Sequence, residues 1–207
     1  VGLEAAIAGR TVGFVLTNPG HYVLMTRRNG MSSPLATLVP LEQGLAVSSF
    51  GGVIFTRTNL ADLTRLTDLK GRTIAATSKG SFGGYQAQAM TLLQLGVDVA
   101  KEARLMETEM PHDKVVHAVL DGRADAGVVR TGVVEAMVRE MKLDSTQIRV
   151  LAPSRTNGFP FAVSTALYPE WPFAAMPDAD GDLARRVAAA LLALPHNGDL
   201  ARRMDIH

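Results

Sequence analysis

The sequence predicts an α/β fold with a mostly parallel sheet, divided into two lobes. Short apolar strands alternate with polar loops and helical segments along the whole chain, and no internal repeat interrupts this alternation. Two strand-like segments, near Phe55 and near Phe161, are expected to cross between the lobes. These crossings put residues 1–56 and 160–207 in a discontinuous lobe 1 and residues 57–159 in lobe 2.

The composition is that of a globular protein and excludes several classes of site. The 207 residues are 47% hydrophobic and 20% charged, and 21 basic side chains balance 20 acidic ones, so a nucleic-acid partner has no electrostatic support. The absence of cysteine excludes disulfides, thiolate metal sites and cysteine nucleophiles. The five histidines show no paired ligand spacing, and we expect neither a metal nor a cofactor.

The beginning of the chain suggests a piece of a longer protein. It begins at Val1, without Met, inside what resembles a helix already under way, and no signal-peptide pattern precedes this helix. No apolar stretch approaches the roughly 18 residues that cross a bilayer. We therefore expect a trimmed or partial fragment.

The expected elements follow from apolar periodicity and from Gly and Pro punctuation. Strands are predicted at residues 11–16, 35–40, 50–57, 73–76, 103–106, 126–129, 148–151 and 159–164. Helices are predicted at residues 3–8, 23–27, 59–66, 86–95, 111–120, 133–141 and 182–194, and residues 168–173 form an aromatic, Pro-bounded loop.

The stretch from Ser78 to Gly84 joins a buried strand to a helix and has the composition of an anion cradle. The first N–H groups of a helix lack internal partners and carry partial positive charge, which favours an oxyanion. Glycines such as Gly80 let the backbone approach a ligand closely, and the Ser78 and Ser81 hydroxyls can donate hydrogen bonds. The alternative for Ser81 is an ordinary N-cap.

Polar residues at other strand ends are further candidates, because ligands in open α/β sheets bind at the carboxyl ends of strands. Asn18 and Tyr22 follow the first strand. The alternative to a ligand role is a turn residue for Asn18 and a half-buried packing residue for Tyr22. His112 begins a helix after a strand, and its alternative is a structural histidine. Arg130 ends a strand, where its guanidinium suits a bidentate oxyanion, and its alternative is a salt bridge to Glu135 or to a neighbouring lobe.

Several motifs in the same order resemble known families across nearly the whole chain. The motifs at residues 68–75, 78–85, 112–113, 122–127 and 129–131 resemble the phosphonate/phosphite-type periplasmic binding proteins. Those at residues 14–22, 50–55 and 164–174 resemble a narrower branch, the extracytoplasmic sensor domains of histidine kinases similar to the tetrathionate sensors.

The resemblance implies a type II periplasmic-binding-protein fold, with two lobes, a hinge and a cleft for a small sulfur or phosphorus oxyanion. The ligand-binding residues that it implies, together with those expected above, are Asn18, Tyr22, Ser78, Gly80, Ser81, Phe82, His112, Arg130 and Thr131. Family members often carry an acidic residue near the position of Gly13, and they usually have an extra strand, helix and strand at the start and continue past the last helix. The first lobe is therefore expected to be incomplete.

Three functions compete at this point. The first is a periplasmic sensor domain of a two-component histidine kinase that is tethered to the inner membrane, with a homodimer formed through the parent kinase among its partners. The second is the substrate-binding protein of a phosphonate-type ABC transporter. The third is a hydrolase with Ser78 or Ser81 as nucleophile and His112 as base, but the sequence has no G-x-S-x-G elbow and no motif that places an acidic partner for His112, so no catalytic residue is expected. Walker-type nucleotide binding is excluded separately, because the stretch lacks the Gly-Lys-Ser/Thr ending.

Overall fold

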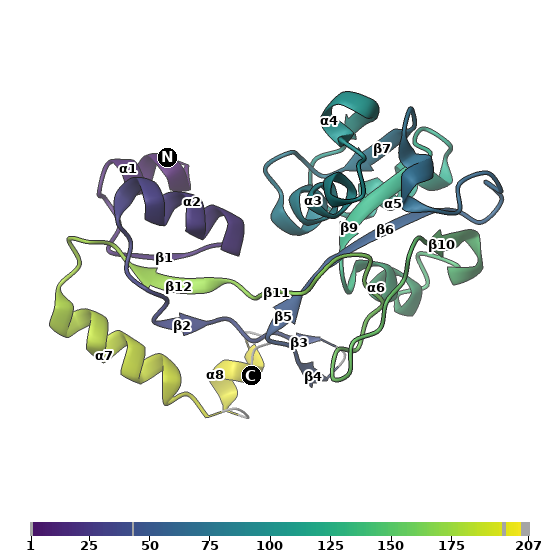
Figure 1. Ribbon diagram of the computed structural model, residues 1–207. Helices are drawn as coiled ribbons and strands as arrows, with labels where there is room; N and C mark the ends of the chain where they lie inside the picture. Colours follow the sequence, from purple (N-terminus) through teal and green to yellow (C-terminus); the bar gives the residue numbers. More distant parts are fainter. Residues whose placement is uncertain (1, 43, 196–197, 204–207) are drawn as a thin grey trace. The chain divides into compact units, whose positions relative to one another are not determined.

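The computed structural model describes residues 2–42, 44–195 and 198–203 and divides into two compact units (Figure 1). Unit 1 comprises residues 1–49 and 168–207, and unit 2 comprises residues 50–167.

Unit 1 is built on a small antiparallel sheet. Its strand order is β1-β12-β2, and Phe14, Val15 and Leu16 of β1 pair with Ala175, Ala174 and Phe173 of β12. Its elements are α1 (Leu3–Ala8), β1 (Phe14–Leu16), α2 (Pro19–Asn29), β2 (Ala36–Thr37), β3 (Leu41–Glu42), β4 (Leu45–Ala46), β11 (Tyr168–Pro169), β12 (Pro172–Ala175), α7 (Gly181–Leu192) and α8 (Asp199–Arg203). β5 (Ser49–Phe50) spans the division between the units and pairs with β11.

The core of unit 1 lies between β1, β12 and the first two helices. Ile7 of α1, Val15 of β1, Met25 of α2 and Ala174 of β12 are all buried and belong to one cluster. Helix α7 lies on the other side of the sheet in Figure 1 and has no buried residue. The aromatic segment predicted as a loop instead supplies β11 and β12, because its backbone pairs with distant strands.

Unit 2 is built on a mixed five-stranded sheet of order β10-β6-β9-β7-β8. β7 pairs in parallel with β8 and β9, whereas β6 pairs antiparallel with β9 and β10, so the sheet is mixed rather than mostly parallel. The elements are β6 (Gly52–Arg57), a 3₁₀ turn (Leu66–Leu69), β7 (Thr73–Ala76), a π-turn (Phe82–Gln86), α3 (Ala87–Gln94), α4 (Val99–Glu102), β8 (Arg104–Glu107), α5 (Asp113–Leu120), β9 (Ala126–Arg130), α6 (Val133–Arg139), a 3₁₀ turn (Ser145–Gln147) and β10 (Ile148–Val150).

Both faces of this sheet are covered, which explains why its inner strands β6, β7 and β9 are mostly apolar and buried. Along β6, Val53 and Phe55 pack with the residues of α5 and α6, whereas Ile54 packs with those of α3 and α4. Successive side chains of a strand point to opposite faces. Unit 2 therefore has three layers, with one apolar core on each side of the sheet.

The observed division differs from the boundaries expected after residues 56 and 159. The expected boundary would cut β6, but β6 pairs with β9 from Gly52 to Thr56 and so lies in unit 2. The predicted strand at residues 159–164 is absent from the described structure except for one bridge, between Ser154 and Val163. Instead, the Ser164 hydroxyl accepts a hydrogen bond from the Ile54 N–H at 3.0 Å, which fastens this segment to β6.

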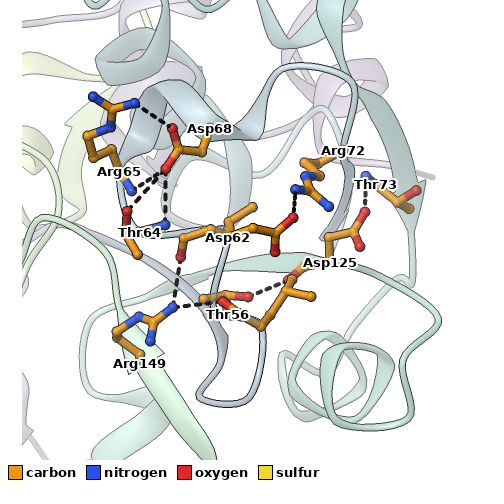
Figure 2. A network of polar contacts seen from close by, with 11 residues as sticks. Thr56, Asp62, Thr64, Arg65, Asp68, Arg72, Thr73, Asp125 and Arg149 are labelled. Carbon is orange, nitrogen blue, oxygen red and sulfur yellow. Dashed lines mark hydrogen bonds and ion pairs between the residues drawn. The ribbon is translucent and has the colours of Figure 1, made fainter.

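The predicted helix at residues 59–66 is also wrong, because side chains bind its backbone groups (Figure 2). Arg149 donates to the carbonyls of Leu60 and Leu63, each at 2.9 Å. Asp68 accepts hydrogen bonds from the N–H groups of Thr64 and Arg65. With these groups occupied, the segment forms irregular turns between β6 and β7.

Candidate functional site

The predicted cradle lies between β7 and α3, where the sequence analysis expected it. β7 ends at Ala76, and the π-turn Phe82–Gln86 leads into α3. The Ser81 hydroxyl accepts a hydrogen bond from the Gly84 N–H at 3.1 Å, so Ser81 is the N-cap of this turn. This geometry confirms the capping alternative and leaves the positive end of the helix facing the loop.

Neighbouring polar groups hold the cradle loop in place. The Lys79 N–H donates to the Glu107 carboxylate at 3.0 Å, and the Gln86 side chain donates to the Lys79 carbonyl at 3.2 Å. The Ser81 N–H donates to the Ser78 carbonyl at 3.1 Å. A Cβ at Gly80 would meet only the Ser78 hydroxyl, at 3.9 Å, so the backbone at Gly80 is open to an approaching ligand.

Three polar side chains converge on Gly84. A Cβ built there would lie 2.4 Å from Thr77 Oγ1, 2.7 Å from Ser81 Oγ and 2.9 Å from His112 Cε1. His112 therefore reaches the cradle from the start of α5, as expected from its position after a strand. Sequence reasoning missed Thr77, whose one signal is that it is the first polar residue after the apolar run of β7.

Two of these side chains have buried polar atoms without a partner. Among the described residues, neither Thr77 Oγ1 nor His112 Nδ1 makes a hydrogen bond. Burial, followed by the nearby positive charge of Arg130, lowers the pKa of His112 below its ordinary value of 6.5. A neutral imidazole thus stands beside the hydroxyl groups of the cradle at neutral pH.

Arg130 lies against the aromatic side of the cradle. Its guanidinium carbon is 4.6 Å from the centre of the Phe50 ring, and Phe82 meets the same ring edge to face at 5.8 Å. A Cβ at Gly83 would lie 3.1 Å from Phe50 Cε2 and 3.3 Å from Arg130 Cβ. Unit 2 therefore brings together an arginine, a histidine, hydroxyl groups and a helix start.

The remaining predicted site residues make structural contacts. Thr131 is buried and forms two hydrogen bonds with Gly51: its N–H donates to the Gly51 carbonyl at 3.0 Å, and its hydroxyl accepts from the Gly51 N–H at 3.1 Å. In unit 1, Asn18 caps α2 by accepting from the His21 N–H at 2.9 Å. The Tyr22 hydroxyl donates to the Ser32 carbonyl at 2.7 Å. A ligand role for these three residues stays a prediction.

The described residues contain no group of three or more His, Asp or Glu residues that could hold a metal ion. In the same part of the chain, no helix is long and apolar enough to cross a membrane.

Comparison with known proteins identifies the family. The family model described as the periplasmic substrate-binding protein of the phosphonate ABC transporter matches residues 2–207. The chain belongs to this family. This match confirms the family that the motifs implied. As a member of the family, the chain is an extracytoplasmic ligand-binding domain, which is also the location that the motifs implied.

A curated relative agrees with the narrower resemblance. The chain is 33% identical over 194 residues to the tetrathionate sensor histidine kinase TtrS of Salmonella typhimurium. This alignment covers 93% of the chain but 32% of TtrS, so the chain spans about a third of that relative.

Solved structures confirm the type II binding-protein fold. XAC2383 from Xanthomonas citri, bound to ATP, matches with a TM-score of 0.72 and 21% identity over 98% of this chain and 72% of its own. PhnD1 from Prochlorococcus marinus, in complex with methylphosphonate, matches with a TM-score of 0.64 and 17% identity over 98% of this chain and 73% of its own.

Proposed function

We propose that this member of the phosphonate-binding family is the ligand-sensing domain of a membrane-tethered histidine kinase and binds a small sulfur or phosphorus oxyanion on the cradle of unit 2. The observation that carries the proposal is the meeting of Arg130, His112 and the capped helix start in one unit. The similarity to TtrS over 93% of the chain supports the sensor role. Closure of the two lobes over the anion, and dimerisation through the kinase, are parts of the same proposal.

The three groups supply complementary interactions with an oxyanion. A guanidinium forms charge-assisted bonds, often two in parallel, with the oxygens of a tetrahedral anion. The helix start adds N–H donors and partial positive charge. A neutral His112 can donate one further hydrogen bond without the cost of burying a second positive charge beside Arg130.

The test is a binding panel measured by isothermal titration calorimetry and thermal shift. Tetrathionate, thiosulfate, sulfate, phosphate and methylphosphonate are titrated into the wild type, Arg130→Ala and Arg130→Lys. Loss of a charge-assisted contact costs about 1.5–3 kcal/mol, so Arg130→Ala should weaken binding roughly 10- to 150-fold. Arg139→Ala, which removes an exposed arginine of α6, should leave the Kd unchanged.

A second role is supported by the family description and by the fold shared with PhnD1. In that role the domain is the free binding component of an ABC transporter. The sequence that follows residue 207 in the full-length protein separates the two: a transmembrane helix and a kinase region support the sensor. A wild type that binds none of the five anions would refute both roles.

The hydrolase alternative gains no support from the geometry. Among the described residues, no hydrogen bond joins His112 to Ser78 or Ser81, and the Ser81 hydroxyl already caps the turn. Nucleophilic catalysis requires the serine and its base within hydrogen-bond reach.

A further inference from the structure

Gln88, in the first turn of α3, is a polar side chain in a place where an apolar one would be ordinary. It is fully buried, and it lies over Gly52 of β6, where a Cβ would come within 2.4 Å of the Gln88 amide. The glycine thus provides the space that the glutamine occupies. Sequence reasoning gave Gln88 no role, because glutamine is an ordinary helix former.

The amide of Gln88 joins the cradle to β9. Its Nε2 donates to the Gly83 carbonyl at 2.7 Å and to the Val129 carbonyl at 2.8 Å. Gly83 belongs to the π-turn, and the Ala87 N–H, which an α-helix would direct to Gly83, bonds to the Phe82 carbonyl instead. The Gln88 side chain therefore supplies a donor where the π-turn has shifted one.

These two carbonyls also fix the orientation of the amide. Both partners are acceptors, so only the NH₂ group can face them, and Gln88 Oε1 stays buried without a partner among the described residues. An unpartnered buried oxygen lowers the free energy of unfolding. The benefit of glutamine at this position must therefore lie in the bridge that its NH₂ group makes.

Each end of the bridge adjoins a group of the proposed anion site. Val129 directly precedes Arg130, and Gly83 lies in the turn whose N-cap is Ser81. The turn and Arg130 are already in close contact, since a Cβ at Gly83 would lie 3.3 Å from Arg130 Cβ. A shift of the turn relative to β9 would therefore move the helix start relative to the guanidinium.

We propose that Gln88 is a positioning residue for anion binding: its amide sets the spacing between the cradle and Arg130. This inference rests on the proposed function. Without the bridge, the two groups no longer meet the anion in one geometry, and binding weakens although Gln88 touches no ligand. Preorganised spacing of donors contributes to affinity in this way because less ordering is left to occur on binding.

The test is a double-mutant cycle with Gln88→Met and Arg130→Lys. The probe is whichever of tetrathionate, thiosulfate, sulfate, phosphate and methylphosphonate the wild type binds most tightly in the calorimetric panel. Methionine matches glutamine in length but donates no hydrogen bond, and we expect it to raise the Kd roughly 2- to 13-fold, the loss typical of one neutral hydrogen bond. The matched control is Gln94→Met, at the exposed end of the same helix, which should leave the Kd unchanged.

The cycle distinguishes positioning from a merely structural role. If Gln88 acts through the spacing to Arg130, the double variant should bind about as weakly as the weaker single variant, because residues that act as a unit are not additive. The inference would be overturned if the increase in Kd of the double variant equalled the product of the two single increases. It would also be overturned if Gln88→Met lowered the melting temperature but left the Kd unchanged. A wild type that binds none of the five anions would overturn the proposed function first, which is a separate result.

A second variant keeps the test decisive if Gln88→Met does not fold. Gln88→Glu keeps the shape but has no donor when ionised, and a protonated carboxyl regains one. The Kd of Gln88→Glu divided by that of the wild type should therefore fall as the pH is lowered from about 7.5 to about 5.5, since burial raises the pKa of a carboxyl group into this range. A ratio that does not change with pH would contradict the positioning role.

Discussion

Gly84→Ala is the substitution for which the structure predicts the clearest effect. The new methyl group would lie 2.4 Å from Thr77 Oγ1, 2.7 Å from Ser81 Oγ and 2.9 Å from His112 Cε1, all shorter than a carbon–oxygen or carbon–carbon contact allows. Gly84 is not among the residues with positive φ, so alanine causes no backbone strain there. The effect is therefore a measure of side-chain crowding in the cradle.

The expected magnitude follows from three contributions. Overpacking of a tight site costs about 1–3 kcal/mol. Displacement of the Ser81 cap costs about 1 kcal/mol more, and the reduced entropy of the unfolded chain returns about 0.5–1 kcal/mol. The free energy of unfolding should therefore fall by about 1–3.5 kcal/mol, as measured by urea titration followed by far-UV circular dichroism.

Two companions make this measurement specific. Gly80→Ala, in the same loop, places its methyl group only near Ser78 Oγ at 3.9 Å, an ordinary contact, so the free energy of unfolding should stay unchanged or rise by up to about 1 kcal/mol. Thr77→Ala removes the nearest atom, so Gly84→Ala should be milder in that background. A Gly84→Ala protein as stable as the wild type, or an equal loss in both backgrounds, would refute the crowded geometry.

Two further predictions concern the stability of unit 2. Because burial and Arg130 lower the pKa of His112, the unfolded chain binds a proton more readily there, so this penalty on stability is absent above about pH 6.5 and grows as the pH falls toward the folded-state pKa. Urea titrations at about pH 7.5 and about pH 5.5 should show a smaller difference in the free energy of unfolding in His112→Gln than in the wild type, and an equal difference would contradict this cause. Asp125 accepts a hydrogen bond from the Thr73 N–H at 2.8 Å (Figure 2), and Asp125→Ala should lower the free energy of unfolding by about 1–2 kcal/mol. Asp121→Ala, which breaks an exposed ion pair with Arg123, should lower the free energy of unfolding by less than about 0.5 kcal/mol. Equal decreases in Asp121→Ala and Asp125→Ala would contradict the greater importance of the Asp125 hydrogen bond.

Local chemistry explains which parts of the fold could be predicted. β7 has the predicted ends, because the apolar run from Thr73 to Ala76 packs on both faces and polar residues stop it on both sides. The helix predicted at residues 59–66 does not form, because its backbone binds a side chain from a distant part of the chain. Its apolar spacing is helical, but Arg149, more than 80 residues away, occupies its carbonyls. Periodicity does not contain such distant partners.

The same distinction holds for the candidate site. The cradle could be expected because helix starts have recognisable capping residues, and Ser81 is one. Gln88 and Phe50 could not be expected, since their importance comes from Gly52, Gly83 and Arg130, which only the tertiary fold places beside them. Buried polar roles of this kind leave no local pattern in a sequence.

The pairing of β1 with β12 also constrains the order in which the two units can fold during synthesis. The middle strand of the unit 1 sheet comes from Pro172–Ala175, which the ribosome adds only after the whole of unit 2. The five strands of unit 2, in contrast, are complete once β10 has been synthesised. Domains generally fold as their chains emerge from the ribosome. Unit 2, with its anion cradle, can therefore fold before β12 is synthesised, whereas the unit 1 sheet cannot form until β12 pairs with β1 and β2.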